Sequence, residues 1–185
     1  DVCANVTTLM CFTCQVSRKS APRLSCKSAP FYDRFLKRNE SLPVSIISQW
    51  WINLSSKAEA TGIKLELRHV DLTAAKWPSE RYQNAICVFG HFDTETQKQV
   101  LEGIRKSLLN GGWFIGELYS KEQINYKTGG PKNIEYLYDP WDILQVFKQD
   151  HIHHFYVGEQ ERQEGELHCG KCHVIQFAIQ VIKSK

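Results

Sequence analysis

LLNGGWFIGELYSKEQINYKTGGPK, residues 108–132, has the pattern of a helix end, a glycine turn, a buried strand and a polar loop. Gly111 and Gly112 can adopt the positive φ angles that stop a helix and turn the chain back toward a sheet. The strand that follows, Trp113–Leu118, carries one ionisable side chain, Glu117. Because α/β proteins build ligand sites beyond the carboxyl ends of their strands, we expect a ligand site where this strand enters the loop.

The residues that precede this stretch alternate between helical and strand patterns. Ser45–Thr61 carries one apolar helical face, and Ile63–Leu72 alternates apolar with charged side chains as a half-buried strand does. Ala85–Phe89 is a short apolar run that predicts a strand buried on both faces. Thr94–Leu109 predicts an amphipathic helix whose N-cap is its first residue or the preceding Asp93.

The same alternation continues after the central loop. Asp139-Pro140 starts a helix, because proline is tolerated in the first helical turn. Residues 152–160 and 173–182 have strand patterns, and the polar connection around Gly165 favours an antiparallel pair. This order predicts an α/β fold with a mostly parallel, twisted sheet, helices on both faces and a C-terminal antiparallel strand pair.

Composition narrows the class of protein. The 185 residues are 42% hydrophobic and 23% charged, which fits a globular domain rather than a disordered chain. A net charge of +3, without a basic run interleaved with aromatic residues, gives no reason to expect a nucleic-acid partner. No apolar stretch approaches the ~18 residues of a membrane span. We therefore expect no membrane association and a cytoplasmic location.

The cysteines do not predict a disulfide framework, because seven is an odd number. Cys11-x-x-Cys14 and Cys169-x-x-Cys172 resemble the paired ligands of a zinc site, and His168 and His173 flank the second pair. The two pairs lie far apart in sequence, whereas zinc ribbons close short loops. We expect no metal, with the second pair lying at the start of a strand.

From about Ser45 onward the chain resembles class I S-adenosylmethionine-dependent methyltransferases, most closely the small bacterial group related to tellurite-resistance and thiopurine methyltransferases. The resemblance covers about three quarters of the chain. It rests on an ordered series of blocks: Lys57-Ala58-Glu59-Ala60, His69-Val70-Asp71-Leu72, Leu108-Leu109-Asn110-Gly111-Gly112, the segment Glu117–Lys132, and Glu164-Gly165-Glu166-Leu167-His168 followed by Val174-Ile175. It implies a Rossmann-like fold and S-adenosylmethionine as cofactor.

The resemblance also implies roles for particular residues. Asp71 would accept hydrogen bonds from the adenine amino group, and Leu72 would supply a backbone contact. Phe89, Gly90 and His91 would face the methionine part and the transferred methyl. The acceptor, a small molecule, would be lined by Glu117, Tyr119, Tyr126, Gly129, Gly130 and Lys132.

Displacement of the methyl by a soft nucleophile such as a thiolate needs little help from a base, whereas a hydroxyl acceptor needs one. His91 and Glu117 are the candidate catalytic residues for that task. Each assignment has a purely structural alternative. Asp71 can cap a turn, His91 can be a solvated loop histidine, and Tyr126 with the Gly-Gly-Pro-Lys turn can simply shape the loop.

The first third of the chain departs from the family pattern. Thr8–Phe12 resembles the first strand, but no glycine occurs before Gly62, and no carboxylate follows the apolar residues near Val44. Residues 1–32 are poor in acid and rich in serine and threonine, as in an organellar transit peptide. We therefore divide the chain into an atypical leader, residues 1–32, and a single methyltransferase-like domain, residues 33–185.

Two hypotheses for the function follow from these patterns. The first is methyl transfer from S-adenosylmethionine to a small, soft acceptor such as a thiol or chalcogen, favoured by the Glu117–Lys132 segment. The second is a methyltransferase-fold protein that has lost catalysis and acts as a binding or regulatory partner, favoured by the missing glycine loop. The sequence does not indicate an oligomeric state.

Overall fold

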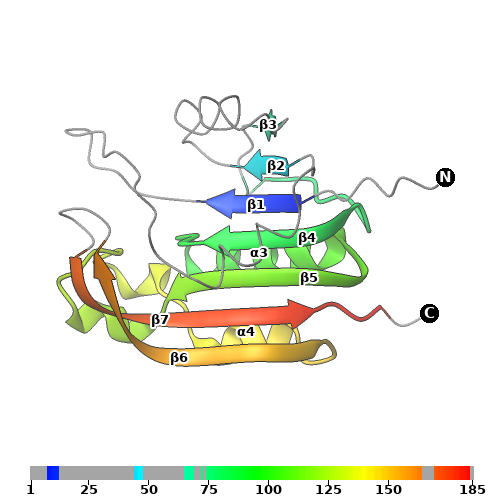
Figure 1. Cartoon of the computed structure of the whole chain (residues 1–185). Coiled ribbons are helices and arrows are strands. Elements are labelled where there is room, and N and C mark those ends of the chain that lie inside the picture. Colours follow the sequence, from blue (N-terminus) through cyan, green and yellow to red (C-terminus); the bar gives the residue numbers. More distant parts are fainter. Residues whose placement is uncertain are drawn as a thin grey trace.

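The computed structural model describes residues 8–12, 44–47, 65–68, 72, 74–163 and 169–183, with side chains from residue 72 onward. Seven strands form one sheet in the order β3-β2-β1-β4-β5-β7-β6 (Figure 1). Only β7 runs opposite to the others. The strands are β1 (Thr8–Phe12), β2 (Val44–Ile47), β3 (Leu65–Arg68), β4 (Tyr82–Val88), β5 (Leu108–Tyr119), β6 (His151–Gln163) and β7 (Cys169–Gln180). The predicted Rossmann-like sheet with a C-terminal antiparallel pair is confirmed.

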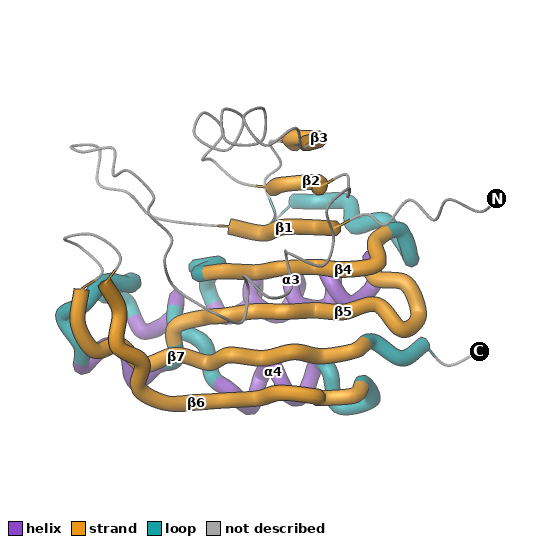
Figure 2. The backbone as a smooth tube through the Cα atoms, in the orientation of Figure 1, coloured by secondary structure: helices purple, strands orange, loops and turns teal. Residues whose placement is uncertain are grey.

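Two α-helices of the described residues cover one face of this sheet. They are α3 (Thr94–Ser107) and α4 (Pro140–Val146), and both lie behind β4–β7 in Figure 2. Their inner side chains share one core cluster with the sheet, which includes Ile104 of α3, Ile143 of α4 and Phe177 of β7. Helices predicted for the opposite face fall on residues outside the described part of the chain.

The helix predicted over Ser45–Thr61 is wrong at its start, because Val44–Ile47 forms β2. This short run is rich in β-branched residues, and β2 is paired on both sides, with β1 and with β3. Strands buried within a parallel sheet have continuous apolar runs, which a helical pattern over so few residues matches equally well. The rest of the predicted helix lies outside the described residues.

The predicted glycine turn lies inside β5 rather than between the helix and the strand, because α3 ends at Ser107 and β5 begins at Leu108. Gly111 has φ +78°, as predicted, whereas Gly112 is fixed by close packing, because an added Cβ would come within 2.8 Å of the Gln83 carbonyl oxygen. Strand pairing begins at once after the helix, and the register with β4 then shifts across the glycines. The Gly111 N–H donates to the Val181 carbonyl oxygen at 2.8 Å, which ties the turn to the end of β7.

Residues 8–12, within the segment that we separated as a leader, form an inner strand of the sheet, third from one edge. β1 pairs in parallel with β2 on one side and with β4 on the other (Figure 1). The division of the chain at residue 32 stays a prediction. Among the described helices, none is long and apolar enough to cross a membrane.

Candidate functional site

The candidate site lies at the carboxyl ends of three neighbouring strands. Phe12 of β1 is in register with Val88 of β4, which is in register with Glu117 of β5. The strand order reverses between β1 and β4, because the chain builds outward from β1 toward β3 and from β4 toward β5. Open α/β sheets bind their ligands in the crevice at such a switch point.

Phe89 follows β4 directly and has an unusual backbone conformation. Its φ of 51° lies in the left-handed region, which bulky side chains rarely adopt. Its N–H donates to the Glu117 carbonyl oxygen at 2.9 Å, so the loop after β4 is attached to the end of β5. Backbone strain of this kind persists where surrounding contacts enforce it, often at ligand sites.

Three aromatic rings gather around this residue, which we call the aromatic group: Phe89, His91 and Tyr119. The Phe89 and Tyr119 ring centroids are 4.6 Å apart, and the His91 ring lies parallel to that of Tyr119 at 5.8 Å. Tyr119 is only 1% exposed, whereas Phe89 and His91 are half-buried. The structure thus brings together Phe89 and His91, which the resemblance assigned to the methyl side, and Tyr119, which it assigned to the acceptor side.

The Glu117 side chain is buried, with Glu117 5% exposed, and both of its carboxylate oxygens have partners. Its Oε1 forms an ion pair with Nη2 of Arg162, and its Oε2 accepts a hydrogen bond from Gln176 Nε2 at 2.8 Å. A carboxylate held by a guanidinium and an amide is stabilised in its charged form and is poorly placed to take up a proton. The predicted role of Glu117 as a base therefore gains no support from its contacts.

Sequence analysis missed Arg162 and Gln176, the two partners of Glu117. The predicted strand ends at residue 160, which leaves Arg162 in the polar connection, whereas β6 continues to Gln163. Arg162 is 4% exposed and its Nε donates to Cys172 Sγ at 3.0 Å. No sequence signal marked Arg162, because the residues in phase with it along the predicted strand, such as His154 and Gln160, do not form an apolar face.

The loop after β5 folds back over Tyr119. It contains the 3₁₀ helices η1 (Lys121–Asn125) and η2 (Ile134–Tyr136). The Gln123 side chain holds it, accepting from the His173 backbone N–H at 2.7 Å and donating to the Gly129 carbonyl oxygen at 3.1 Å. Gly130 has φ +81°, and an added Cβ would lie 3.0 Å from the Tyr119 ring. The predicted acceptor residues Tyr119, Gly129 and Gly130 are therefore neighbours.

Tyr126 and Lys132, also predicted on the acceptor side, lie apart from this contact. The Tyr126 hydroxyl donates to Glu159 Oε1 at 2.8 Å, and Lys171 pairs with the other Glu159 oxygen at 2.9 Å. The hydrogen bond to Glu159 raises the pKa of Tyr126, while the hydrogen bonds from Lys171 and then Tyr126 lower the pKa of Glu159. Lys132 is exposed. Tyr126 thus fastens the loop to β6.

Ser120 and His173 form a second attachment of this loop. The Ser120 Oγ and the His173 Nδ1 are 2.6 Å apart, and Ser120 is 2% exposed. The same Oγ accepts from the Glu122 N–H at 3.2 Å as the N-cap of η1. Burial and the capping bond indicate that this hydroxyl stabilises the loop rather than attacking a substrate.

The second cysteine pair does not converge on a common point in β7. Cys169 is exposed, whereas Cys172 is fully buried against Arg162. No group of three or more His, Cys, Asp or Glu side chains suited to a metal ion occurs within the described ranges.

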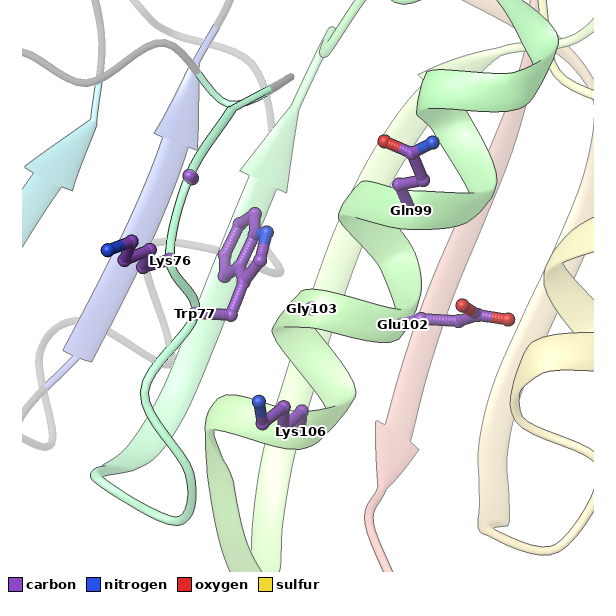
Figure 3. A pocket seen from close by; sticks show the side chains of 7 residues that line it. Lys76, Trp77, Gln99, Glu102, Gly103 and Lys106 are labelled. Carbon is purple, nitrogen blue, oxygen red and sulfur yellow. The ribbon is translucent and has the colours of Figure 1, made fainter.

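A hollow on the helical face lies away from these residues, along the second half of α3 (Figure 3). The Trp77 ring covers Gly103, where an added Cβ would come within 2.4 Å of the ring. Lys76, Lys106, Gln99 and Glu102 surround it with mixed charge and mostly exposed side chains. This hollow has no convergent polar groups, so the carboxyl end of the sheet is the better candidate.

Comparison with solved structures relates this geometry to known proteins. A methyltransferase from Clostridium acetobutylicum, described as S-adenosylmethionine-dependent, has a TM-score of 0.57 and 12% identity over 97% of this chain and 85% of its own. The N-methyltransferase NodS from Bradyrhizobium japonicum, in complex with S-adenosyl-L-homocysteine, has a TM-score of 0.58 and 7% identity over 96% of this chain and 79% of its own. The chain has the methyltransferase fold.

TehB from Haemophilus influenzae shares this fold with a TM-score of 0.60 and 11% identity. The match covers 76% of this chain and 50% of TehB, so this chain spans about half the length of that relative. No protein-family model and no curated protein sequence matches the chain. The similarity to methyltransferases is therefore one of fold.

Part of the cofactor cradle that the methyltransferase resemblance implies can be compared with the described residues. Phe89 and Gly90 follow β4 at the switch point, the part of an open α/β sheet where ligands bind. An added Cβ on Gly90 would come within 3.1 Å of Cys87 Sγ, so the loop is closely packed against the strand. The Leu72 side chain belongs to the core, and its backbone role stays a prediction. Asp71 and the segment after β1 lie outside the described residues.

Proposed function

We propose that this protein is an S-adenosylmethionine-dependent methyltransferase acting on a small, soft acceptor. The proposal rests chiefly on one observation, the strand order with a switch point between β1 and β4 and an antiparallel β7. Solved methyltransferases with the same fold, one of them in complex with S-adenosyl-L-homocysteine, support it. The described loop after β4 lies where the cofactor would bind.

When bound, S-adenosylmethionine supplies a methyl group on a sulfonium. The task of the chain is then to align the acceptor and to exclude water, and well-oriented reactions gain roughly 7–11 kcal/mol from such alignment. The aromatic group is suited to both tasks, because the half-buried Phe89 and His91 rings stack on the buried Tyr119 ring and are held rigidly at the ends of β4 and β5. The loop over Tyr119, fastened by Gln123, closes the acceptor side.

The contacts of Glu117 favour a soft acceptor. Both of its oxygens are engaged, by Arg162 and by Gln176, so it is not available to remove a proton from a hydroxyl group. A thiol, with an ordinary pKa of about 8.5, ionises far more readily than a hydroxyl group, and its thiolate needs little base catalysis. Of the two candidate bases, His91 and Glu117, only His91 then remains.

Cofactor binding is the first property to measure. We expect saturating S-adenosylhomocysteine or S-adenosylmethionine to raise the unfolding midpoint, because a ligand at 100 times its dissociation constant adds about 2.7 kcal/mol. For a chain of this size the rise is roughly 5–10 °C. A folded sample whose midpoint moves with neither ligand contradicts the proposal and supports the alternative of a fold that has lost catalysis.

The acceptor class needs a separate experiment. Matched pairs of thiol and alcohol with the same carbon skeleton should be incubated with the protein and methyl-labelled S-adenosylmethionine. We expect label on the thiols and little or none on the alcohols at neutral pH. Transfer to the alcohols at an equal rate would contradict the soft-acceptor assignment without affecting the assignment of the cofactor.

A further inference from the structure

Arg162 connects the edge of the sheet to the candidate site. It belongs to β6, the edge strand, yet its side chain is 4% exposed. Burial of a guanidinium is costly unless its donors are satisfied and its charge is paired. The partners of Arg162 therefore indicate the role of this buried side chain.

The partners of Arg162 lie on three different elements. The guanidinium pairs with Glu117 of β5, and its Nε donates to Cys172 of β7 at 3.0 Å. Its central carbon lies 4.5 Å from the ring centroid of Phe89 and 5.8 Å from that of Tyr119. One flat cation thus contacts the strained residue after β4 and the acid at the end of β5 together.

We propose that Arg162 is a positioning residue of the methyltransferase site: it holds the Phe89 ring, and with it the loop after β4, in the conformation that receives the cofactor, and it keeps Glu117 engaged. The inference rests on the proposed function. Phe89 is the contact that carries it, because a left-handed backbone at a bulky residue needs an external contact to persist. A cation over the face of a ring supplies such a contact in a desolvated place.

The shape of the guanidinium matters as much as its charge. Arginine presents a planar surface to a ring while its edge donors bind a carboxylate, whereas lysine presents a compact ammonium on a flexible stem. Arg162→Lys should therefore preserve the charge opposite Glu117 without restoring the contact with Phe89. A role that is only electrostatic would be rescued by lysine, and a positioning role would not be.

The experiment measures S-adenosylhomocysteine affinity by calorimetry and unfolding midpoints without ligand. The variants are Arg162→Lys, Arg162→Met and the double variant Arg162→Met with Glu117→Gln. The double variant removes both charges of the pair, so it should recover much of the stability lost in Arg162→Met. We expect each of the three to bind the ligand at least tenfold more weakly than the wild type, the double variant included.

A second ion pair with a buried carboxylate provides the matched control. Arg105 on α3 pairs with Asp150 at 2.6 Å on the helical side of the molecule. Arg105→Met should lower the unfolding midpoint and leave the affinity within twofold of the wild type. Two results would overturn the positioning role. One is wild-type affinity for S-adenosylhomocysteine in the folded double variant, and the other is wild-type affinity in Arg162→Lys. A wild-type protein that binds no S-adenosylhomocysteine would overturn the proposed function, and this inference with it.

Discussion

Phe89 is held against its own conformational preference by its neighbours. A left-handed φ at a bulky residue costs on the order of 1–3 kcal/mol. The N–H bond to the Glu117 carbonyl, the stack on Tyr119 and the Arg162 guanidinium offset that cost. The strained conformation aims the following residues, Gly90 and His91, along the end of β5. The positions of these residues therefore depend on packing across three strands.

His91 is the residue whose replacement should separate catalysis from binding. Its ring lies against Tyr119 at the end of the sheet, beside the place where the acceptor would approach. We expect His91→Ala to lower kcat about tenfold. This is less than the factor of roughly 10²–10⁴ that full general-base catalysis supplies, because a soft acceptor needs less help from a base. Calorimetry should find the S-adenosylhomocysteine affinity within twofold of the wild type. Unchanged turnover would remove His91 from the mechanism.

Gly116 tests how tightly the rings of the core are packed beneath the site. A Cβ at this position would lie 2.1 Å from Cζ of Phe177 on β7, so Gly116→Ala forces the ring to move. Phe177 is 1% exposed and packs against Phe114 and Phe155, which leaves it little room. We expect a loss of about 1–3 kcal/mol in denaturant unfolding.

Phe177→Leu provides the counterpart to that substitution. The smaller side chain vacates the space that the new methyl group needs. The double variant should therefore lose less stability than the sum of the two single variants. Strict additivity would mean that the clash at Gly116 does not determine the effect.

At the scale of elements, both described α-helices begin with an aspartate cap that titrates in acid. The N–H and the hydroxyl of Thr96 donate to Asp93 at 3.0 Å each, and these bonds lower its pKa below the ordinary 3.8. The Trp141 N–H lowers the pKa of Asp139 in the same way, with Lys121 adding to the effect. Each aspartate has a lower pKa in the folded protein than in the unfolded chain. It therefore stabilises the fold fully at pH values above its unfolded pKa, and this stabilisation is lost as the pH falls through its folded pKa.

The caps therefore predict a specific acid response. We expect the unfolding midpoint to fall by a few degrees as the pH drops below about 4, where the caps become protonated. Asp93→Asn keeps an acceptor for the helix and should reduce that acid-dependent fall. Asp93→Ala should lower the midpoint at neutral pH as well. An identical pH profile in the wild type and Asp93→Asn would show that this cap does not contribute.

The elements were predictable where local periodicity and capping determine them. α3 begins at Thr94 after its Asp93 cap, and Pro140 opens α4, because both signals act within one turn of the chain. The predicted helix from Ser45 overlaps β2, since the choice between helix and strand over so short a run, Val44-Ser45-Ile46-Ile47, depends on the neighbouring strands. The predicted strand over residues 152–160 is shorter than β6, because the last residues of β6 are polar and become a strand only through their pairing with β7.

The candidate site was predictable in position and less so in its contacts. The rule that ligand sites lie beyond strand ends pointed to the end of the strand that carries Glu117, and the methyltransferase resemblance supplied Phe89 and His91. The structure brings these residues together at the ends of β4 and β5. The engagement of Glu117 was not predictable, because Arg162 lies far along the chain and meets it only through the strand order β5-β7-β6. A side chain that appears reactive in sequence can thus be neutralised by a residue whose proximity only the fold reveals.

For the whole molecule, Asp150 joins parts of the structure that are distant in sequence. Its carboxylate accepts from Arg105 of α3 at 2.6 Å and from the Ile182 backbone N–H at 2.8 Å. Asp150→Ala should lower the free energy of unfolding by about 3 kcal/mol, because the partly buried Arg105 guanidinium would lose its carboxylate partner. Denaturant unfolding would measure the loss, and S-adenosylhomocysteine affinity should stay within twofold. A loss below 1 kcal/mol would mean that water replaces the carboxylate at little cost.

The place of β7 has a consequence for how the protein is made. β7 lies between β5 and β6 although it follows both along the chain (Figure 1). On the ribosome, β5 and β6 emerge before the strand that joins them, so β5 presents an open edge while synthesis continues. Open edges recruit strands from other chains. A polypeptide that ends soon after Gln163 should therefore aggregate or be degraded rather than persist as a smaller folded protein, and slow translation beyond Gln163 would prolong the vulnerable period.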